Sequence, residues 1–169
     1  MTKVGVLGTG VVGQTLADRL VGLGHEVMMG ARQAGNEKAT AWAAAAGASA
    51  SAGTFADAAG FGALIVNATA GTASLDALDA AGAENLAGKA IVDVANPLDF
   101  SAGMPPSLSV CNTDSLGEQI QRRFPDARGR QVAQHGQRRR HGAARHRPRP
   151  PHHVPVRQRR PGKQQVRSA

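Results

Sequence analysis

The sequence of 169 residues contains one cysteine, Cys111, so an internal disulfide framework is excluded. It contains no apolar run of 18 residues, and no membrane-spanning helix is predicted. The N-terminus also lacks the pattern of a secretory signal peptide. These absences favour a soluble, cytoplasmic protein with no membrane partner. The length is sufficient for one domain with its own hydrophobic core.

Acidic residues are missing from the last quarter of the chain, where basic residues accumulate. Residues 1–126 hold 12 Asp and Glu against 7 Lys and Arg, a net charge of −5, whereas residues 127–169 hold 13 Lys and Arg and carry +13. Large apolar residues are scarce there, so this segment cannot bury enough surface to offset its ordering entropy. We therefore expect an ordered domain over residues 1–128 and a disordered, Arg/Pro/His-rich basic tail over residues 129–169.

A basic tail suggests two functions, nucleic-acid binding and metal binding. Basic arms bind the nucleic-acid backbone by counterion release, but this tail has no aromatic residue for base stacking and no recognisable reading motif. Its five histidines have spacings that fit no common metal site, and no cysteine or carboxylate accompanies them. We expect no metal and no specific nucleic-acid partner; nucleic-acid binding through the tail remains the weaker alternative.

The most informative segment lies between an apolar run, Lys3–Leu7, and an amphipathic stretch that reaches Leu23. It has the pattern G-x-G-x-x-G, placed between a predicted strand and a predicted helix. There the first glycine permits a tight turn, the second lets the backbone approach a pyrophosphate, and the third lets helix and strand pack closely. The free amides of the helix N-terminus attract phosphate. We predict that a dinucleotide pyrophosphate binds at Gly8, Thr9, Gly10, Val11, Val12 and Gly13.

The end of the next predicted strand, residues 24–30, indicates which dinucleotide binds. An NAD site usually carries Asp or Glu there to bond the ribose 2′-hydroxyl, whereas this chain continues with Ala31 and Arg32. A guanidinium can hold a 2′-phosphate with paired hydrogen bonds, and no carboxylate is present to repel it. Lys38 adds a further positive charge. The sequence therefore favours NADP over NAD, with a solvated loop arginine as the alternative interpretation of Arg32.

Up to Asp126, predicted strands alternate with predicted helices. The strands are residues 3–7, 24–30, 63–67 and 90–93; the helices are residues 11–23, 36–46, 75–79 and 115–123, with a further helix starting at residue 54. This alternation indicates an α/β fold, a Rossmann-like doubly wound parallel sheet with helices on both faces. Ligands of such sheets bind beyond the carboxyl ends of the strands, which places Gly8, Arg32, Asn67, Thr69 and Asn96 along one rim.

Four segments of the chain resemble the coenzyme F420-dependent NADP oxidoreductases. They are Val6–Gly13, Gly30–Arg32, Asp93–Leu98 and Asp114–Gln121, the last followed by Phe124 and Pro125. The resemblance runs in order through residues 1–128. It implies NADP(H) as the cofactor and reversible hydride transfer between NADPH and coenzyme F420, a deazaflavin, or a related acceptor.

The same resemblance places Ala68, Thr69, Asn96 and Pro97 beside the ribose and nicotinamide of the cofactor. For Thr69 and Asn96 an equally good alternative is that they only satisfy loop backbone groups. No catalytic side chain is implied, because the cofactor carries the chemistry and the protein holds it against the acceptor.

The chain departs from the family after residue 128, where relatives have a Val-Val-Lys segment followed after two residues by Asn-Thr. Residues 130–141 can be back-translated so that a frame shifted by one base gives Val-Lys-Ser-Leu-Asn-Thr-Val-Asn-Ala-Asp-Val-Met, which is similar to the family's segment. Our hypothesis is that residues 129 to about 161 are an out-of-frame (frameshift) reading. Resequencing codons 126–165 tests it; an unbroken frame that encodes the same residues refutes it.

This departure makes the sheet incomplete at its C-terminal side, since the last strand and most of the acceptor-side structure are expected to be missing. A non-catalytic NADP(H)-binding remnant is therefore the alternative to an active NADP-dependent oxidoreductase. The expected partner is a small-molecule acceptor whose identity the sequence does not fix. A homo-oligomer is left open.

Overall fold

The computed structural model describes residues 1–99, 101, 103–110 and 114–131. Cys111 and the tail from residue 132 on, with the disorder expected there, lie outside these residues. Along the described chain the elements are β1 (Lys3–Leu7), α1 (Val11–Gly22), β2 (Glu26–Ala31), α2 (Glu37–Ala46), β3 (Ala50–Thr54), α3 (Phe55–Phe61), β4 (Leu64–Asn67), the 3-10 turn η1 (Gly71–Ala73), α4 (Ser74–Ala81), α5 (Ala83–Leu86), β5 (Ala90–Asp93), β6 (Leu98–Asp99), β7 (Ser107–Leu108), α6 (Leu116–Arg123) and β8 (Arg128–Gln131).

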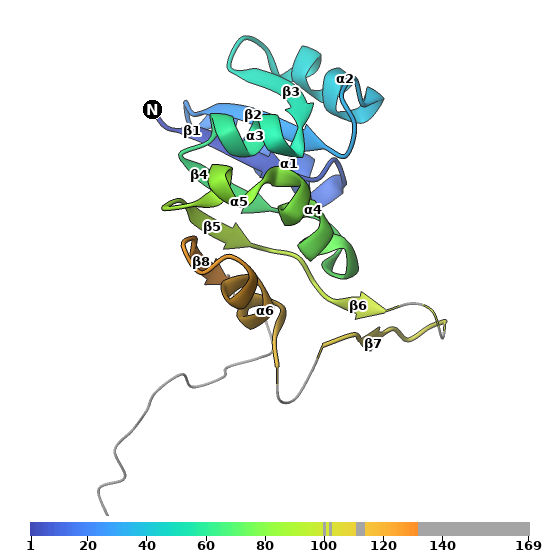
Figure 1. The fold of residues 1–169 in the computed structure, drawn as a ribbon. Helices are drawn as coiled ribbons and strands as arrows, with labels where there is room; N and C mark the ends of the chain where they lie inside the picture. The colour runs from blue at the N-terminus through green and yellow to red at the C-terminus, as the bar shows by residue number, and fades with distance from the viewer. Residues whose placement is uncertain (100, 102, 111–113, 132–169) are drawn as a thin grey trace, which may run out of the picture. The chain divides into compact units, whose positions relative to one another are not determined.

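The main sheet has the strand order β3-β2-β1-β4-β5-β8, and all of its neighbouring strands are parallel (Figure 1). The order reverses at β1, because the chain runs outward from β1 to β3 and then crosses back to β4. In an open α/β sheet this reversal marks the crevice in which ligands bind. The predicted Rossmann-like, doubly wound fold is therefore confirmed, and the G-x-G-x-x-G turn follows the strand at which the order reverses.

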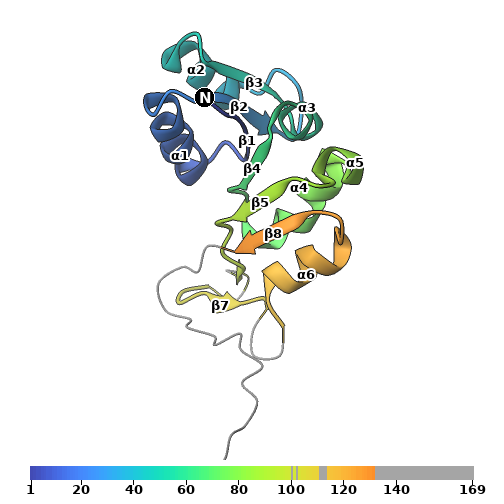
Figure 2. The ribbon, with the colours of Figure 1, turned by 90° about the vertical axis from the view of Figure 1, so that its left-hand side faces the viewer.

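Two hydrophobic clusters cover the two faces of the sheet, as the predicted architecture requires. Val4 and Val6 of β1 point to the face that packs α1 and α2, where Trp42 is buried. Leu7 of β1 and Ile65 of β4 point to the opposite face, which α3, α4, α5 and α6 cover. Figure 2 shows α1 and α2 on one side of the strands and α3, α4 and α5 on the other. Alternate residues of each buried strand thus enter different clusters.

Helices α2, α3 and α6 each begin after a residue whose side chain caps the helix N-terminus. The Asn36 side chain accepts a hydrogen bond from the Ala39 amide at the start of α2. Thr54 and Asp57 form a reciprocal capping box at the start of α3, and these hydrogen bonds hold the pKa of the Asp57 carboxyl below its usual range. Ser115 caps α6 by accepting from the Glu118 amide. The predicted helix starts at residues 36, 54 and 115 are confirmed.

Strand β3 is not predicted from the sequence, and its residues explain why. Buried strands are marked by large apolar and β-branched residues. The sequence of β3, Ala-Ser-Ala-Gly-Thr, has no large apolar residue, and its only β-branched residue is the terminal threonine. At the edge of the sheet it needs only backbone hydrogen bonds to β2, which any residue type supplies.

A short strand adjoins β5 at the C-terminal side of the sheet, the side at which the sequence analysis expects the sheet to be incomplete. Residues Arg128–Gln131 form β8, which pairs parallel to β5 in the register Ala90 to Arg128 through Asp93 to Gln131. This pairing does not require particular side chains, because the hydrogen bonds between neighbouring strands are made by the backbone. Strand β8 thus includes the boundary at residue 128 that the sequence analysis gives for the domain.

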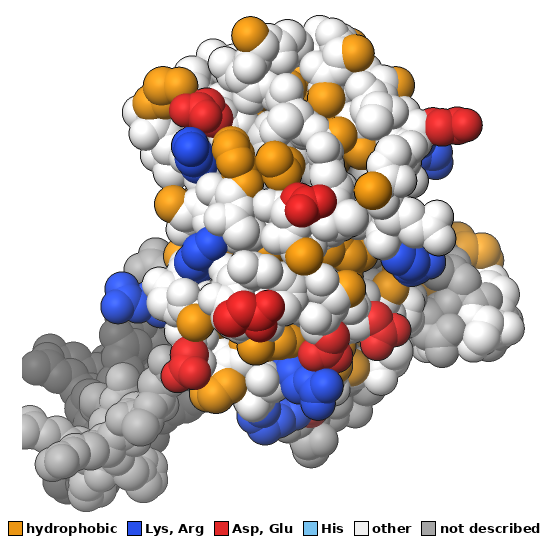
Figure 3. Space-filling view, turned by 45° about the horizontal axis from the view of Figure 1, so that its top comes forward, with side chains coloured by type: hydrophobic (Ala, Val, Ile, Leu, Met, Phe, Trp, Pro, Cys, Tyr) orange, Lys and Arg blue, Asp and Glu red, His pale blue; other side chains and the backbone are white. Residues whose placement is uncertain are grey.

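The surface of the described residues carries charges of both signs. Figure 3 shows acidic and basic side chains close together on one face, interspersed with apolar ones. Among the described residues, Arg123 of α6 pairs with Asp79 of α4 at 3.0 Å, and Arg122 of α6 pairs with Asp114, which precedes this helix, at 2.7 Å. Arg122 holds the pKa of Asp114 down at about 2. Among the described residues, no helix is long and apolar enough to cross a membrane.

Candidate nucleotide-binding site

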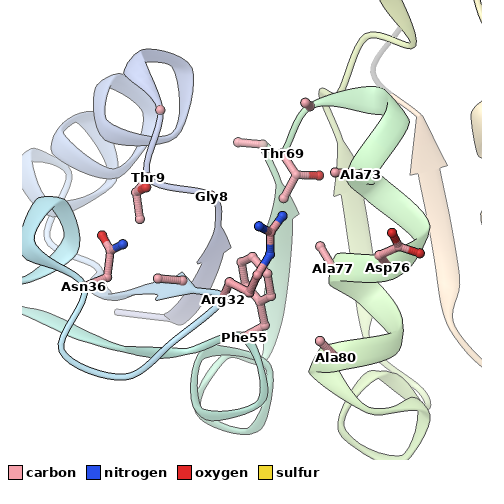
Figure 4. Close-up of a pocket in the computed structure, with 14 residues that line it drawn as sticks. Gly8, Thr9, Arg32, Asn36, Phe55, Thr69, Ala73, Asp76, Ala77 and Ala80 are labelled. Atoms are coloured by element: carbon pink, nitrogen blue, oxygen red, sulfur yellow. The ribbon is translucent and has the colours of Figure 1, made fainter.

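A cleft of about 580 Å³ lies beyond the carboxyl ends of the central strands, at the point where the strand order reverses. One wall is the turn after β1 and the other is the loop after β4 together with α4 (Figure 4). The volume lies within the range of small-molecule and cofactor sites. The residues that line the cleft are Gly8, Thr9, Gly10, Ala31, Arg32, Asn36, Phe55, Ala68, Thr69, Ala70, Ala73, Asp76, Ala77 and Ala80.

The first and third glycines of the turn are required by close packing. Gly8 has φ +117°, and a Cβ there would lie 2.6 Å from the carbonyl oxygen of Ala68. At Gly13 a Cβ would collide with the carbonyl oxygen of Gly8 and would also contact Ala68. These positions therefore fix how the start of α1 sits against the loop after β4, which agrees with the roles predicted for them.

The second glycine has a different environment. Gly10 is exposed in the cleft with an ordinary extended backbone, φ −76° and ψ 175°, and a Cβ there would meet no protein atom within 4 Å. Its own backbone therefore does not require glycine. The space that a side chain would fill belongs to the cleft, as expected where a ligand approaches the backbone closely.

Helix α1 begins at this turn without a side-chain cap. Its N-cap residue is Gly10, and the first amide bonded back into the helix is that of Gln14, which donates to the Gly10 carbonyl at 3.0 Å. Within the described residues, the amides of Val11, Val12 and Gly13 therefore have no hydrogen-bond acceptor. Unsatisfied amides at a helix N-terminus, with the positive end of the helix dipole, form an anion site.

Arg32 stands at the other end of the cleft, directly after β2. Its side chain is exposed and points from β2 across the cleft toward the loop after β4 (Figure 4). Within the described part of the chain its guanidinium has no ion-pair or hydrogen-bond partner. Asn36, which caps α2, also lines the cleft, on the side of Thr9 (Figure 4). The cleft thus offers amides at one place and a free guanidinium at another, which fits a ligand with two separated phosphate groups.

Several residues of the cleft are not predicted from the sequence. Phe55 is the aromatic residue of its lining and follows β3, the strand without a sequence signal. Ala77 and Ala80 of α4 present small side chains to the cleft, with Ala73 of η1 and Asp76 beside them. Residues spaced three and four apart lie on one face of a helix. This spacing does not indicate whether that face lines a cleft or packs into a core.

Six predicted site residues lie outside the cleft lining. One of them, Gly13, packs against Gly8 and Ala68 instead. Val11 and Val12 are 83% and 55% exposed, and their side chains do not line the cleft. Lys38 lies in the first turn of α2, beyond the lining residues. Asn96 and Pro97 pack against Gly71, whose amide donates to the Asn96 carbonyl at 3.2 Å. The predicted contacts of these side chains with a nucleotide stay predictions.

Beneath the cleft wall lies a buried polar network that crosses from β4 to β5. Asn67 is fully buried and donates to the Asp93 carboxylate at 2.9 Å and to the Ser74 hydroxyl. Asp93 also accepts from the Ala95 amide at 3.2 Å, while its second oxygen has no partner in the described chain. Burial raises the pKa of the Asp93 carboxyl above its usual range, although the hydrogen bonds from Ala95 and Asn67 oppose the rise.

The raised pKa of Asp93 gives the folding stability a pH dependence of known sign. The native carboxyl keeps its proton to a higher pH than the unfolded one, so the native state binds more protons in the window that starts at the ordinary aspartate pKa of about 3.9. The free energy of unfolding therefore falls as the pH rises through that window. In an Asp93→Asn variant the side chain does not titrate, so this decrease in the free energy of unfolding is absent. The difference in free energy of unfolding, variant minus wild type, should therefore be greater at pH 7 than at pH 4. Urea denaturation at both pH values measures the difference; an equal difference at both contradicts the assignment.

The sequence matches the family of coenzyme F420-dependent NADP oxidoreductases over residues 3–97. Among solved structures it is similar to a candidate F420-dependent NADP reductase from Arthrobacter sp. FB24, with 51% identity and a TM-score of 0.72. That match covers 78% of this chain and 61% of the Arthrobacter chain, so this chain spans about three fifths of the length of that relative.

More distant structures share the fold. An imine reductase from Streptomyces aurantiacus is 24% identical with a TM-score of 0.55, over 76% of this chain and 39% of its own. A reductive aminase from Aspergillus terreus, in complex with NADPH and ethyl-5-oxohexanoate, is 22% identical with a TM-score of 0.55, over 78% and 39%. No curated protein matches the sequence. The match over residues 3–97, together with the glycine turn and the fold around it, shows that the chain belongs to the F420-dependent NADP oxidoreductase family.

Proposed function

We propose that the cleft binds NADP(H), with the pyrophosphate at the start of α1 and the 2′-phosphate on Arg32. The observation that carries the proposal is the pairing of an uncapped helix N-terminus with an unpartnered guanidinium in one cleft of the described chain. The open space at Gly10 allows a phosphate to approach the backbone, and no carboxylate follows β2 to repel a second one.

In this pose each wall of the cleft has a separate task. The amides of α1 would neutralise the pyrophosphate, and Arg32 would hold the 2′-phosphate through paired, charge-assisted hydrogen bonds. Phe55 and the alanines of α4 offer an apolar surface for the adenosine. Thr69 and Ala70 line the wall that continues toward β5, on which side we place the nicotinamide riboside.

Bound NADPH would supply a hydride, and the protein would position it against an acceptor. We propose a small-molecule acceptor of the deazaflavin type, such as coenzyme F420, because the family is F420-dependent and the Arthrobacter relative carries that description. No side chain of this chain is assigned a proton-transfer role, since the hydride moves between the two ring systems. We propose neither a specific nucleic-acid partner nor a metal.

A non-catalytic NADP(H)-binding remnant is the second candidate. It is favoured by the change at residue 128, after which the sequence has no acidic residue and departs from that of the family. If residues 129 to about 161 are read out of frame, the nucleotide half would keep its ligand while the acceptor half would be lost.

One experiment separates these candidates. The purified chain is titrated with NADPH and with NADH, and NADPH oxidation is then followed spectrophotometrically with coenzyme F420 and with a flavin as acceptors. Saturable NADPH binding with turnover supports the reductase, and binding without turnover selects the remnant. Absence of NADPH binding removes both.

A further inference from the structure

The side chain of Asn67 uses its whole hydrogen-bonding capacity in the wall of the cleft. Its amide nitrogen donates to Asp93 Oδ1 at 2.9 Å and to Ser74 Oγ, and its amide oxygen accepts from Thr69 Oγ1 at 2.8 Å and from the Thr69 amide at 3.4 Å. Two donor hydrogens and two acceptor sites are all that an asparagine side chain has. Asn67 is also fully buried, so water does not compete for these bonds.

The direction of these hydrogen bonds is fixed from the Thr69 end, because the Thr69 backbone amide can only donate and it points to the Asn67 oxygen. At the opposite end, Asp93 Oδ1 accepts from the Ala95 amide at 3.2 Å as well as from the Asn67 nitrogen. A proton on Asp93 would sit on Oδ2, which has no partner within the described chain. The Asn67 nitrogen must therefore face Asp93, and the Asn67 oxygen must face Thr69.

Thr69 consequently has no hydrogen left to offer. A hydroxyl carries one hydrogen, and the hydrogen of Thr69 is committed to the Asn67 oxygen, so only lone pairs of its oxygen remain. Thr69 lines the cleft between the Gly8 turn and Ala73 (Figure 4). A phosphate oxygen cannot donate a hydrogen to this position, whereas a hydroxyl or an amide N–H can.

We propose that Asn67 is a positioning residue that presents Thr69 to the cleft as an acceptor-only hydroxyl, so that this part of the wall selects an uncharged hydrogen-bond donor of the nucleotide. The donor is a ribose hydroxyl or the carboxamide N–H, and phosphates are directed to the start of α1 and to Arg32. This inference rests on the proposed NADP(H) binding. It adds a polar selection point to a cleft wall whose other residues are small and apolar, apart from Asp76.

Three variants of the wall test the proposal by calorimetric titration with NADPH and with 2′,5′-ADP. Thr69→Val removes the acceptor at nearly constant shape and should weaken NADPH binding about fivefold, the usual worth of one neutral hydrogen bond. Thr69→Ser keeps the hydroxyl and should bind within about twofold of wild type. Thr72→Val, at an exposed position of η1 outside the cleft lining, is the matched control and should leave the affinity unchanged. A loss shared by both ligands places the donor on the adenosine side, and a loss for NADPH alone places it on the nicotinamide side.

A double-mutant cycle separates positioning from general support of the fold. If Asn67 acts through the Thr69 hydroxyl, Asn67→Ala weakens NADPH binding in the wild-type background and adds little in the Thr69→Val background. Circular dichroism confirms that each variant is folded at the titration temperature. Should Asn67→Ala not fold, the comparison of Thr69→Val with Thr69→Ser decides alone.

The proposal is overturned if Thr69→Val binds NADPH as wild type does, if Thr69→Ser loses as much as Thr69→Val, or if the Asn67→Ala effect is fully additive. A wild-type chain that binds no NADPH removes the proposed function itself, and this inference with it. That outcome is visible before any variant is compared.

Discussion

Replacing Arg32 with glutamate should weaken NADPH binding about a hundredfold and leave NADH binding equal or tighter. Hydrogen bonds between a guanidinium and a phosphate contribute up to about 3 kcal/mol, which corresponds to about two decades of affinity. In the variant a carboxylate stands beside the 2′-phosphate and repels it. The same carboxylate can accept a hydrogen bond from the free 2′-hydroxyl of NADH. Parallel titrations of both dinucleotides measure the change in preference.

Arg19→Glu is the matched control for this experiment. Arg19 is an exposed arginine in the last turn of α1, outside the cleft lining, and the substitution changes the net charge by the same amount. It should leave the preference for NADPH unchanged. If Arg32→Glu keeps that preference, or if Arg19→Glu abolishes it equally, the guanidinium of Arg32 does not hold the 2′-phosphate.

Alanine at Gly8 and at Gly10 should separate folding from binding. Gly8→Ala places a Cβ 2.6 Å from the Ala68 carbonyl oxygen at φ +117°, so we expect the free energy of unfolding to fall by about 3 kcal/mol. Gly10→Ala meets no protein atom and keeps an ordinary backbone, so stability should stay within about 0.5 kcal/mol of wild type. Its methyl group enters the space that a pyrophosphate needs, and NADPH binding should weaken about tenfold.

Urea denaturation and NADPH titration of both variants provide the readout. We expect Gly10→Ala to be as stable as wild type and to bind NADPH more weakly. A Gly10→Ala variant that binds NADPH normally would show that the pyrophosphate does not approach this part of the turn. A Gly8→Ala variant of unchanged stability would show that the turn can relax away from Ala68.

The parts of the fold that follow from local rules could be predicted from the sequence. The glycine pattern, the caps at residues 36, 54 and 115, and the apolar runs of β1, β4 and β5 each depend on neighbours within a few residues. They sufficed for the parallel sheet and for the placement of Gly8 and Arg32 on one rim.

The parts that depend on distant pairing could not be predicted. Strand β3 consists of small residues that carry no strand signal of their own. Strand β8 pairs through its backbone with β5, although the composition of its segment indicated disorder. The buried network of Asn67, Ser74 and Asp93 needs the register that aligns Asn67 with Asp93, and that register is known only once the sheet is formed.

The residues that line the cleft also fall into two groups, those predictable from the local sequence and those that reach the cleft through tertiary packing. Thr9, Gly10, Ala31 and Arg32 follow or end strands that were predictable, and all four line the cleft. The capping residue of α2 and the aromatic residue after β3 also line it, as do the alanines of α4, which reach the cleft because α4 packs beside the reversal point. Their contribution to the cleft wall comes from tertiary packing.

The most direct test of the central claim is a calorimetric comparison of 2′,5′-ADP with 5′-AMP on the full chain. The two ligands differ only in the 2′-phosphate that we assign to Arg32. Because a hydrogen bond to a charged group contributes about 1.5 kcal/mol or more, we predict that 2′,5′-ADP binds at least about tenfold more tightly than 5′-AMP. Equal affinity for the two ligands would contradict the assignment of Arg32 and, with it, the preference for NADP(H).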